Sequence, residues 1–268
     1  MPAKYTLPQG GVQDVVFFRQ TKQKSTNKMC LLRTLDLCLL HEFQFPVELR
    51  IKIRCFSFAE ITDENIHSAV KSKHALLKHG HISYWDTSKV TNMNCLFSCL
   101  DTLYHDISRW DVSNVKYMSR MFMNIEFFNG PLNDWDVSNV IIMDQMFAGN
   151  SNFNQPLNKW NVSKVQSMEQ MFANCSEFNQ PIGNWDVSNV RNMSLMFENA
   201  EKFNQPLNEW NVENVETAHY LFKECSEFNQ PLDQWRMPNI RNYVGMFQYA
   251  STFNQPLNCK RMMWFFSA

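Results

Sequence analysis

The stretch FNGPLNDWDVSNVIIMDQMF, residues 128–147, carries the pattern from which the architecture follows, because that pattern returns every 25 residues. Tryptophans stand at this spacing without slippage, at Trp85, Trp110, Trp135, Trp160, Trp185, Trp210 and Trp235. A phenylalanine follows each of them after 12 residues, from Phe97 to Phe247. A fixed period of this length is typical of a solenoid, in which neighbouring repeats stack and complete a shared core.

One repeat predicts the elements of each coil. Alternating apolar residues at 135–137 favour a short strand, and the spacing of apolar residues over 143–147 favours a short helix. The segment Leu-x-x-Trp-x-Val is similar to the strand signature of leucine-rich repeats. We therefore expect an α/β fold: a single right-handed leucine-rich-repeat-like solenoid of about seven 25-residue coils, with an N-terminal helical cap region.

The composition divides the chain into four predicted segments. Residues 1–58 carry nine Lys and Arg against four Asp and Glu, although the whole chain has a net charge of −1. We expect a basic, flexible segment at 1–43, a helical cap or F-box-like segment at 44–81, the solenoid at 82–258 and a tail or cap at 259–268. The net charge gives no reason to expect nucleic acid or an anionic membrane as a partner.

Two polar columns accompany the apolar ones. Asparagines recur at 25-residue spacing from Asn129 to Asn254, and we interpret them as hydrogen-bonded ladders along the stack, with a recognition surface as the alternative. A column of Asp86, Asp111, Asp136 and Asp186 is interrupted by Asn161, Asn211 and Arg236. A calcium ladder does not tolerate this alternation, so the column favours turn or cap chemistry.

No constellation of residues in the sequence points to catalysis. The chain lacks the glycine-rich phosphate-binding motifs and has only seven glycines. His79, His81, Cys95 and Cys99 are the best metal candidates, but their spacing fits no common zinc pattern. We therefore expect no enzyme activity, no catalytic residue, no cofactor and no metal.

The cysteines and the hydropathy pattern bear on the cellular compartment. The eight cysteines share no repeat column except at Cys175 and Cys225, which predicts free, mostly buried thiols in a reducing compartment. Cys95 and Cys99 lie four residues apart in the first coil, at positions where small apolar residues are expected. No run of 18 apolar residues and no signal peptide is visible in the sequence. These features favour a cytoplasmic protein that is not embedded in a membrane.

Variation between repeats is the remaining signal for function. The sixth, seventh, ninth and tenth positions after each tryptophan change from coil to coil, whereas the core columns stay fixed. This variation suits a surface that binds a protein partner, and neutral drift at exposed positions explains it equally well. The candidate partner-binding residues are Tyr117, Arg120, Ile141, Ile142, Gln145, Glu169, His219 and Tyr220.

The repeat resembles that of a known family. The segment FNQPLNKWNVSKVQSMEQMF at 153–172, together with NIHSAVK at 65–71 and GHISYWDTSKVTNM at 80–93, is similar to the BspA-like leucine-rich-repeat surface protein family, including mycoplasma-type repeat lipoproteins. The resemblance implies a leucine-rich-repeat-type solenoid and non-enzymatic binding, often at a cell surface. A role as a cell-surface adhesin then requires an export signal outside this reading frame.

A second, shorter resemblance lies before the repeats. The segment QFPVELRIKIRCF at 44–56 resembles the opening helix of an F-box, which docks onto a Skp-type adaptor in ubiquitin ligases. The resemblance implies a substrate receptor of a ubiquitin ligase, and the alternative is a cap for the open end of the solenoid. The candidate adaptor-binding residues are Phe45, Pro46, Leu49, Ile53 and Phe56.

Overall fold

The structure, a computed structural model, describes residues 59–72, 74–98 and 100–256. Every described residue belongs to the unit Ser57–Ala268. The predicted segments 1–43 and 259–268 therefore lie outside the described residues.

Among the described residues, two short helices precede the coils. Helix α3 spans Ile66–Lys71 and buries Ile66 and Ala69 against the core, and helix α4 spans Ala75–His79. A single 3-10 turn, η1, spans Ile82–Tyr84 and leads to the first tryptophan of the repeats.

Residues in and before α3 satisfy backbone groups of the first coil. The carboxylate of Asp63 accepts the N–H groups of Thr91 at 2.7 Å and Asn92 at 3.0 Å, and the hydroxyl of Thr91 at 2.6 Å. Nε2 of His67 lies 2.7 Å from the carbonyl oxygen of Asn94. Because unpaired backbone groups at the edge of a stack invite association with another chain, these contacts protect that edge.

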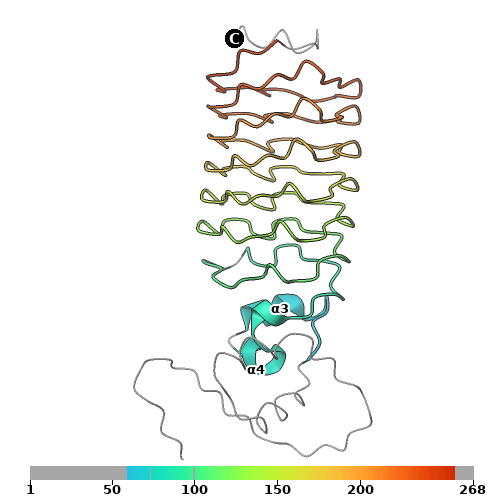
Figure 1. The fold of residues 1–268 in the computed structure, drawn as a ribbon, viewed down its shortest axis with the longest axis vertical. Helices are drawn as coiled ribbons and strands as arrows, with labels where there is room; N and C mark the ends of the chain where they lie inside the picture. Colours follow the sequence, from blue (N-terminus) through green and yellow to red (C-terminus); the bar gives the residue numbers. More distant parts are fainter. Residues whose placement is uncertain (1–58, 73, 99, 257–268) are drawn as a thin grey trace, which may run out of the picture. The chain divides into compact units, whose positions relative to one another are not determined.

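From Trp85 onward, the chain winds into 25-residue coils that lie one on another (Figure 1). Backbone N–H groups at the eighth, tenth, twelfth and fourteenth positions donate to carbonyl groups of the next coil; Arg120 to Asp144, at 2.8 Å, is one example. The seventh residue after each tryptophan forms a single-residue parallel bridge with its equivalent in the next coil. These residues are Asn92, Tyr117, Ile142, Ser167, Asn192, Thr217 and Asn242.

The secondary structure within a coil differs from the prediction. The strand expected at 135–137 is wrong, since the parallel bridge lies at Ile142, and the helix expected over 143–147 is a series of turns. Gln145 has a φ of 57°, in the left-handed region, which a right-handed helix does not contain. In addition, alternate N–H groups in this stretch donate to the next coil rather than four residues back along the chain.

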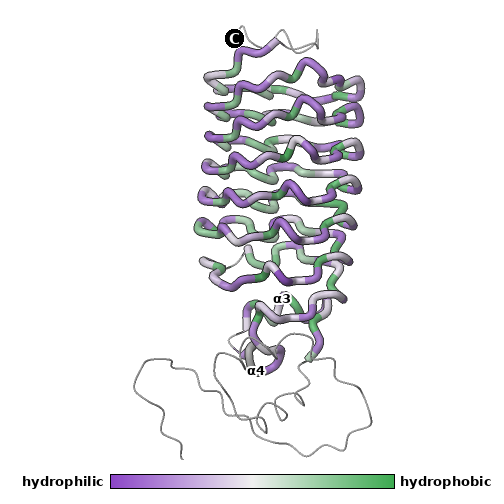
Figure 2. The backbone as a smooth tube through the Cα atoms, viewed as in Figure 1, coloured by the Kyte–Doolittle hydropathy of each residue, from purple (hydrophilic) through white to green (hydrophobic). Residues whose placement is uncertain are grey.

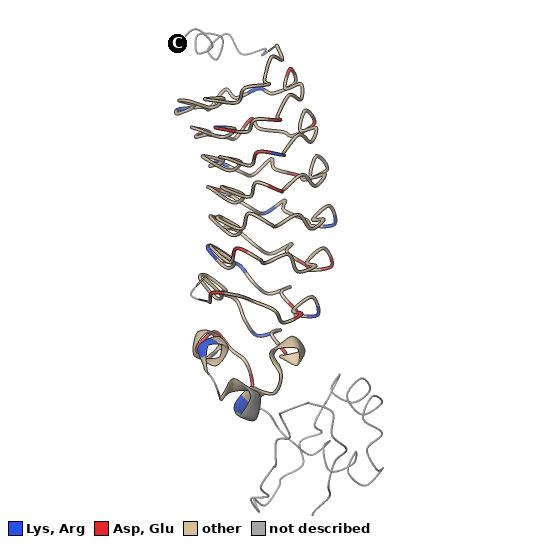
Figure 3. Ribbon diagram, turned by 90° about the vertical axis from the view of Figure 1, so that its left-hand side faces the viewer, with Lys and Arg blue, Asp and Glu red and all other residues tan. Residues whose placement is uncertain are grey.

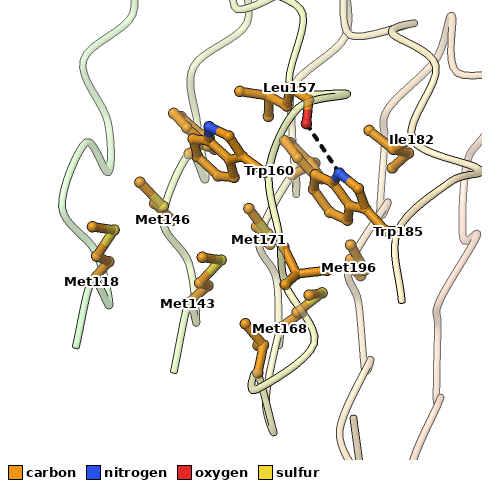
Figure 4. Packing of buried hydrophobic residues seen from close by; sticks show 14 of the residues in the cluster. Met118, Met143, Met146, Leu157, Trp160, Met168, Met171, Ile182, Trp185 and Met196 are labelled. Carbon is orange, nitrogen blue, oxygen red and sulfur yellow. Dashed lines mark hydrogen bonds between the residues drawn. The ribbon is translucent and has the colours of Figure 1, made fainter. Parts of the chain in front are cut away.

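The predicted core columns are confirmed. Apolar and polar residues alternate along every coil (Figure 2), and the apolar columns meet inside the stack (Figure 4). In the twelfth-position column from Phe97 to Phe247, adjacent rings stack with centroids 5.4–5.8 Å apart. The apolar residues of the repeat around Trp135 are all buried: Phe128, Leu132, Val137, Val140, Met143, Met146 and Phe147.

The tryptophan column makes hydrogen bonds as well as apolar contacts. From Trp110 to Trp235, each indole Nε1 donates to the carbonyl group 28 residues earlier, at 2.8–3.2 Å. Figure 4 shows one such bond, from Trp185 to Leu157. The tryptophans are only 3–6% exposed, and from Trp135 onward each ring pairs a buried carbonyl of the preceding coil.

The asparagine column is a hydrogen-bonded ladder, which confirms the structural interpretation of it. From Asn129 to Asn229, each Oδ1 accepts the backbone N–H of the asparagine in the next coil, at 3.0–3.1 Å. From Asn154 onward, the same oxygen also accepts Nε2 of a glutamine in the next coil, such as Gln180 at 2.9 Å.

The aspartate column makes local turns, as predicted. Each of the four aspartates accepts the backbone N–H of the serine two residues later, at 3.0–3.1 Å. Asn161 and Asn211 make the same bond, at 3.1 and 3.2 Å, with Ser163 and Glu213. An amide oxygen therefore replaces a carboxylate without loss of the turn.

The three described cysteines are free, and two of them are buried. Sγ of Cys175 lies 3.1 Å from the carbonyl oxygen of Phe147, and Sγ of Cys225 lies 2.7 Å from that of Phe197. The expectation that Cys95 occupies a position for a small apolar residue is wrong, because Cys95 is exposed at the tenth position of its coil. The remaining cysteines lie outside the described residues: Cys30, Cys38, Cys55, Cys99 and Cys259.

Candidate protein-binding face

The variable positions lie on one part of every coil. We call the sixth, seventh, ninth and tenth residues after each tryptophan the variable face. In the coil of Trp135 these residues alternate with the buried side chains of Val140, Met143 and Met146. The bridges at the seventh position keep the equivalent residues of successive coils in register. The face is therefore a set of parallel columns whose composition changes along the stack.

The structure places all eight candidate partner-binding residues on this face, with different exposures. Tyr117, with 40% of its surface exposed, and Arg120 are exposed. The other six are half-buried: Ile141, Ile142, Gln145, Glu169, His219 and Tyr220.

Three of the apolar candidates lie together. Tyr117 and Ile142 are paired by a parallel bridge, and Ile141 directly precedes Ile142. Neighbouring strands in a parallel pairing lie about 4.8 Å apart, so the side chains at Tyr117 and Ile142 are direct neighbours. The coils of Trp110 and Trp135 thus present a continuous aromatic and aliphatic surface.

Arg120 begins a side-chain ladder in the tenth-position column. Its Nε donates to Oε1 of Gln145, and Nε2 of Gln145 donates to Oε1 of Gln170. All three residues have left-handed backbone conformations, with φ of 58°, 57° and 54°. The ladder fixes the direction of the Arg120 side chain along the stack.

Glu169 and His219 belong to hydrogen-bonded clusters in later coils. The carboxylate of Glu169 accepts Nδ2 of Asn192 at 2.9 Å. Oγ1 of Thr217 lies 2.7 Å from Oγ of Ser194 and 3.1 Å from Nδ1 of His219. These contacts occupy part of the hydrogen-bonding capacity of both candidates.

Asp144 is a charged residue of the face that the candidate set omits. Burial raises the pKa of its carboxyl group above the ordinary value, although hydrogen bonds from the hydroxyl of Ser167 and the N–H of Glu169 oppose the shift. The nearby charge of Glu169 adds to the increase in pKa, and that of Arg120 opposes it. The ninth-position column reads Ser119, Asp144, Glu169 and Ser194 in successive coils, and this variation in charge could have identified Asp144 from the sequence.

Tyr220 packs along the stack. A Cβ atom added to Gly245 in the next coil meets Cε1 of the Tyr220 ring at 2.2 Å, so the ring lies directly over that glycine. Nζ of Lys223 lies 5.6 Å from the centroid of the same ring. This packing makes Tyr220 a weaker candidate for a contact residue than Tyr117.

Sequence reasoning missed the most exposed apolar side chains. These are Tyr104 (84% exposed), Phe127 (64%), Val244 (53%) and Tyr249 (70%), of which Val244 belongs to the variable face. Phe127 could have been found from the sequence, because it occupies a column that is otherwise polar. The equivalent residues of the next coils are Asn152, Glu177 and Lys202.

Other predicted sites fall elsewhere. The five candidate adaptor-binding residues lie outside the described residues, so the F-box-like segment stays a prediction. Within the part of the chain that the structure describes, no group of three or more His, Cys, Asp or Glu side chains is arranged to hold a metal ion. None of the described helices has the length and apolar character needed to cross a membrane.

Comparison with known proteins finds one family. The model of the family described as Mycoplasma protein of unknown function, DUF285, matches residues 64–174 and 143–260, which together cover most of the chain. No match is found among curated proteins or among solved structures.

Proposed function

Because the chain belongs to the family described as Mycoplasma protein of unknown function, DUF285, and this description assigns no activity, we propose a function from the residues of the face itself. The chain is a non-enzymatic scaffold that binds a protein partner through the variable face. The partner contacts side chains of several successive coils, with Tyr117 and Ile142 at the centre of the contact.

The observation that carries this proposal is the contrast between a fixed interior and a varied face held in register. The seventh position reads Asn, Tyr, Ile, Ser, Asn, Thr and Asn along the stack, and each of these residues is bridged to the next. Residues of the adjacent eighth position, such as Met118, Met143 and Met168, are fully buried. A rigid scaffold that presents different side chains from equivalent positions suits specific recognition.

We further propose that the stack is a right-handed leucine-rich-repeat-like solenoid of the BspA-like kind. The 25-residue period and the parallel bridges between successive coils support this assignment. The Leu-x-x-Trp-x-Val segment supports it as well, although it makes turns in this chain.

Ion pairs outside the variable face join neighbouring coils, which favours a structural role for them. Acidic and basic residues are interspersed along the stack (Figure 3). Lys159 pairs with Asp134 at 2.7 Å, and Lys202 pairs with Glu177 at 2.6 Å, in each case between neighbouring coils. Exposed pairs of this kind contribute about 0–1 kcal/mol each, so they align coils and leave recognition to other side chains.

Affinity purification from the source cells, followed by mass spectrometry, tests the proposed function. The full chain is compared with the double variant Tyr117→Ala/Ile142→Ala and with Tyr104→Ala/Phe127→Ala, which removes similar apolar surface away from the variable face. We expect the wild type and Tyr104→Ala/Phe127→Ala to recover the same partners, and Tyr117→Ala/Ile142→Ala to lose them. Equal recovery with all three proteins contradicts the proposal.

A further inference from the structure

Two cations of the variable face differ from most basic residues of the coils. Lys116 and Arg120 are exposed, and neither forms an ion pair with any described residue. Cations at the position of Lys116 in other coils are paired: Arg191 and Arg241 both contact Glu216 at 3.0 Å.

These two cations flank the apolar surface described above. Lys116 directly precedes Tyr117, Arg120 follows it by three residues, and Ile141 and Ile142 lie in the next coil beside them. We call these five residues the basic-apolar patch. Tyr117 is the aromatic residue of the patch and is 40% exposed, so its ring is available for apolar contact with a partner.

The Arg120 guanidinium keeps donors for a ligand. One N–H, at Nε, donates to Gln145, and a guanidinium group has five N–H donors in all. The carboxylate of Asp144, whose charge interacts with that of Arg120, accepts the hydroxyl of Ser167 and the N–H of Glu169 and forms no ion pair with Arg120 among the described residues. The terminal nitrogens of Arg120 can therefore bind a carboxylate in the paired geometry that arginine favours.

Resting on the function proposed above, we propose that the basic-apolar patch binds an acidic segment of a partner protein that carries a large apolar side chain. The apolar side chain packs on Tyr117 and Ile142, and carboxylates on either side of it pair with Lys116 and Arg120. Charge complementarity favours an acidic segment, because Lys116 and Arg120 attract its carboxylates and repel a basic segment. A nucleic acid needs a longer row of cations, whereas Asp144 and Glu169 lie in the coils that follow.

Selection from a random peptide library displayed on phage tests this proposal with the full chain as bait. The peptides that it enriches are then synthesised, and their affinities are measured by fluorescence anisotropy. The test variant is Lys116→Glu/Arg120→Glu. The control, Lys164→Glu/Arg236→Glu, makes the same change of charge at two exposed residues outside the variable face.

We expect enriched peptides with Asp or Glu flanking an aromatic or aliphatic residue, and a loss of affinity of about tenfold or more in the test variant alone. Their affinity also falls as salt concentration rises, because exposed charges are screened. Enriched peptides without acids, equal affinity for both variants, or displacement by a single-stranded oligonucleotide overturns the inference. If the enriched peptides carry no acids but bind more weakly to Tyr117→Ala/Ile142→Ala, the inference about the acidic segment fails and the proposed function stands. If no enriched peptide loses affinity with any variant of the variable face, the inference and the proposed function both fail.

Discussion

At the scale of single residues, the repeated tryptophan is explained by its N–H group as well as its size. Nε1 of Trp160 donates to the carbonyl of Leu132 at 2.8 Å, inside the core. The period of the sequence was enough to predict burial of this column. The acceptor could not be predicted, since it is a backbone atom of another coil.

Trp160→Phe therefore destabilises the chain in two ways. It leaves the buried carbonyl of Leu132 without a donor and opens space beside it, at a combined cost of about 2–4 kcal/mol in the free energy of unfolding. Urea unfolding measures this cost. Met168→Leu serves as a control that conserves core volume and costs less than about 1.5 kcal/mol. A smaller cost for Trp160→Phe than for this control contradicts the role of the hydrogen bond.

The described thiols differ in expected reactivity. Burial raises the pKa values of Cys175 and Cys225 well above the ordinary range, and backbone hydrogen bonds oppose the shift only in part. Because the thiolate is the reactive form, both cysteines resist alkylation by iodoacetamide at pH 8 in the folded chain, whereas exposed Cys95 reacts. Peptide mass spectrometry identifies each site. Modification of all three at equal rates before unfolding contradicts the burial, and addition of urea exposes the two buried thiols as a control.

At the scale of the coil, sequence periodicity predicted the core but not the secondary structure. The apolar spacing over 143–147 is the same for a helix face and for successive turns whose side chains point inward. What separates them is the left-handed residue at the tenth position, which is Arg120, Leu195 or Tyr220 in different coils. Such residues seldom adopt a left-handed conformation. In the tenth-position column, the residue type that indicates this conformation from the sequence is Gly245, in the last described coil.

The close packing of Tyr220 on Gly245 gives a prediction at this scale. Gly245→Ala places a methyl group against the ring and adds a side chain at a φ of 62°, so we expect a loss of about 1–3 kcal/mol in stability. In a Tyr220→Ala background the clash disappears and the same substitution costs about 1 kcal/mol less. Thermal and urea unfolding of the four proteins in this cycle measures the coupling. An equal cost in both backgrounds shows that the ring does not lie over the glycine.

The edge contact of Asp63 gives a second prediction. Asp63→Ala removes the acceptor of the Thr91 and Asn92 N–H groups, so their hydrogen exchange accelerates by about tenfold, whereas Glu64→Ala, an exposed neighbour, has little effect. NMR-detected exchange resolves these amides. Unchanged protection in Asp63→Ala rules out a role for the carboxylate at this edge.

The same contact depends on pH. Partial burial raises the pKa of Asp63, but hydrogen bonds from Thr91 and Asn92 outweigh this effect and hold the pKa below its ordinary value. A lowered pKa in the folded state means that the carboxylate contributes stability above the ordinary value of about 4, and that this contribution is lost as the pH falls through the lowered pKa. The difference in protection between wild type and Asp63→Ala therefore shrinks below about pH 4. A constant difference down to acid pH contradicts this linkage.

At the scale of the whole molecule, the sequence predicted which positions form the candidate site, but not which of them are available. Tyr117 and Tyr220 are both variable-face tyrosines in the sequence, yet one is bridged beside Ile142 and exposed, and the other packs on Gly245. That difference depends on the residue one coil further on, at the same or a neighbouring column. A single repeat does not contain this information.

Site-specific photocrosslinking tests the central claim, that the variable face is the surface that binds a protein partner. Tyr117 is replaced by the photoreactive phenylalanine derivative p-benzoylphenylalanine in the full chain, and the same replacement at Tyr104, which is 84% exposed and lies off the face, is the control. After irradiation in extract of the source cells, we predict a discrete crosslinked partner from position 117 and none from position 104. The same adduct from both positions, or from position 104 alone, contradicts the account.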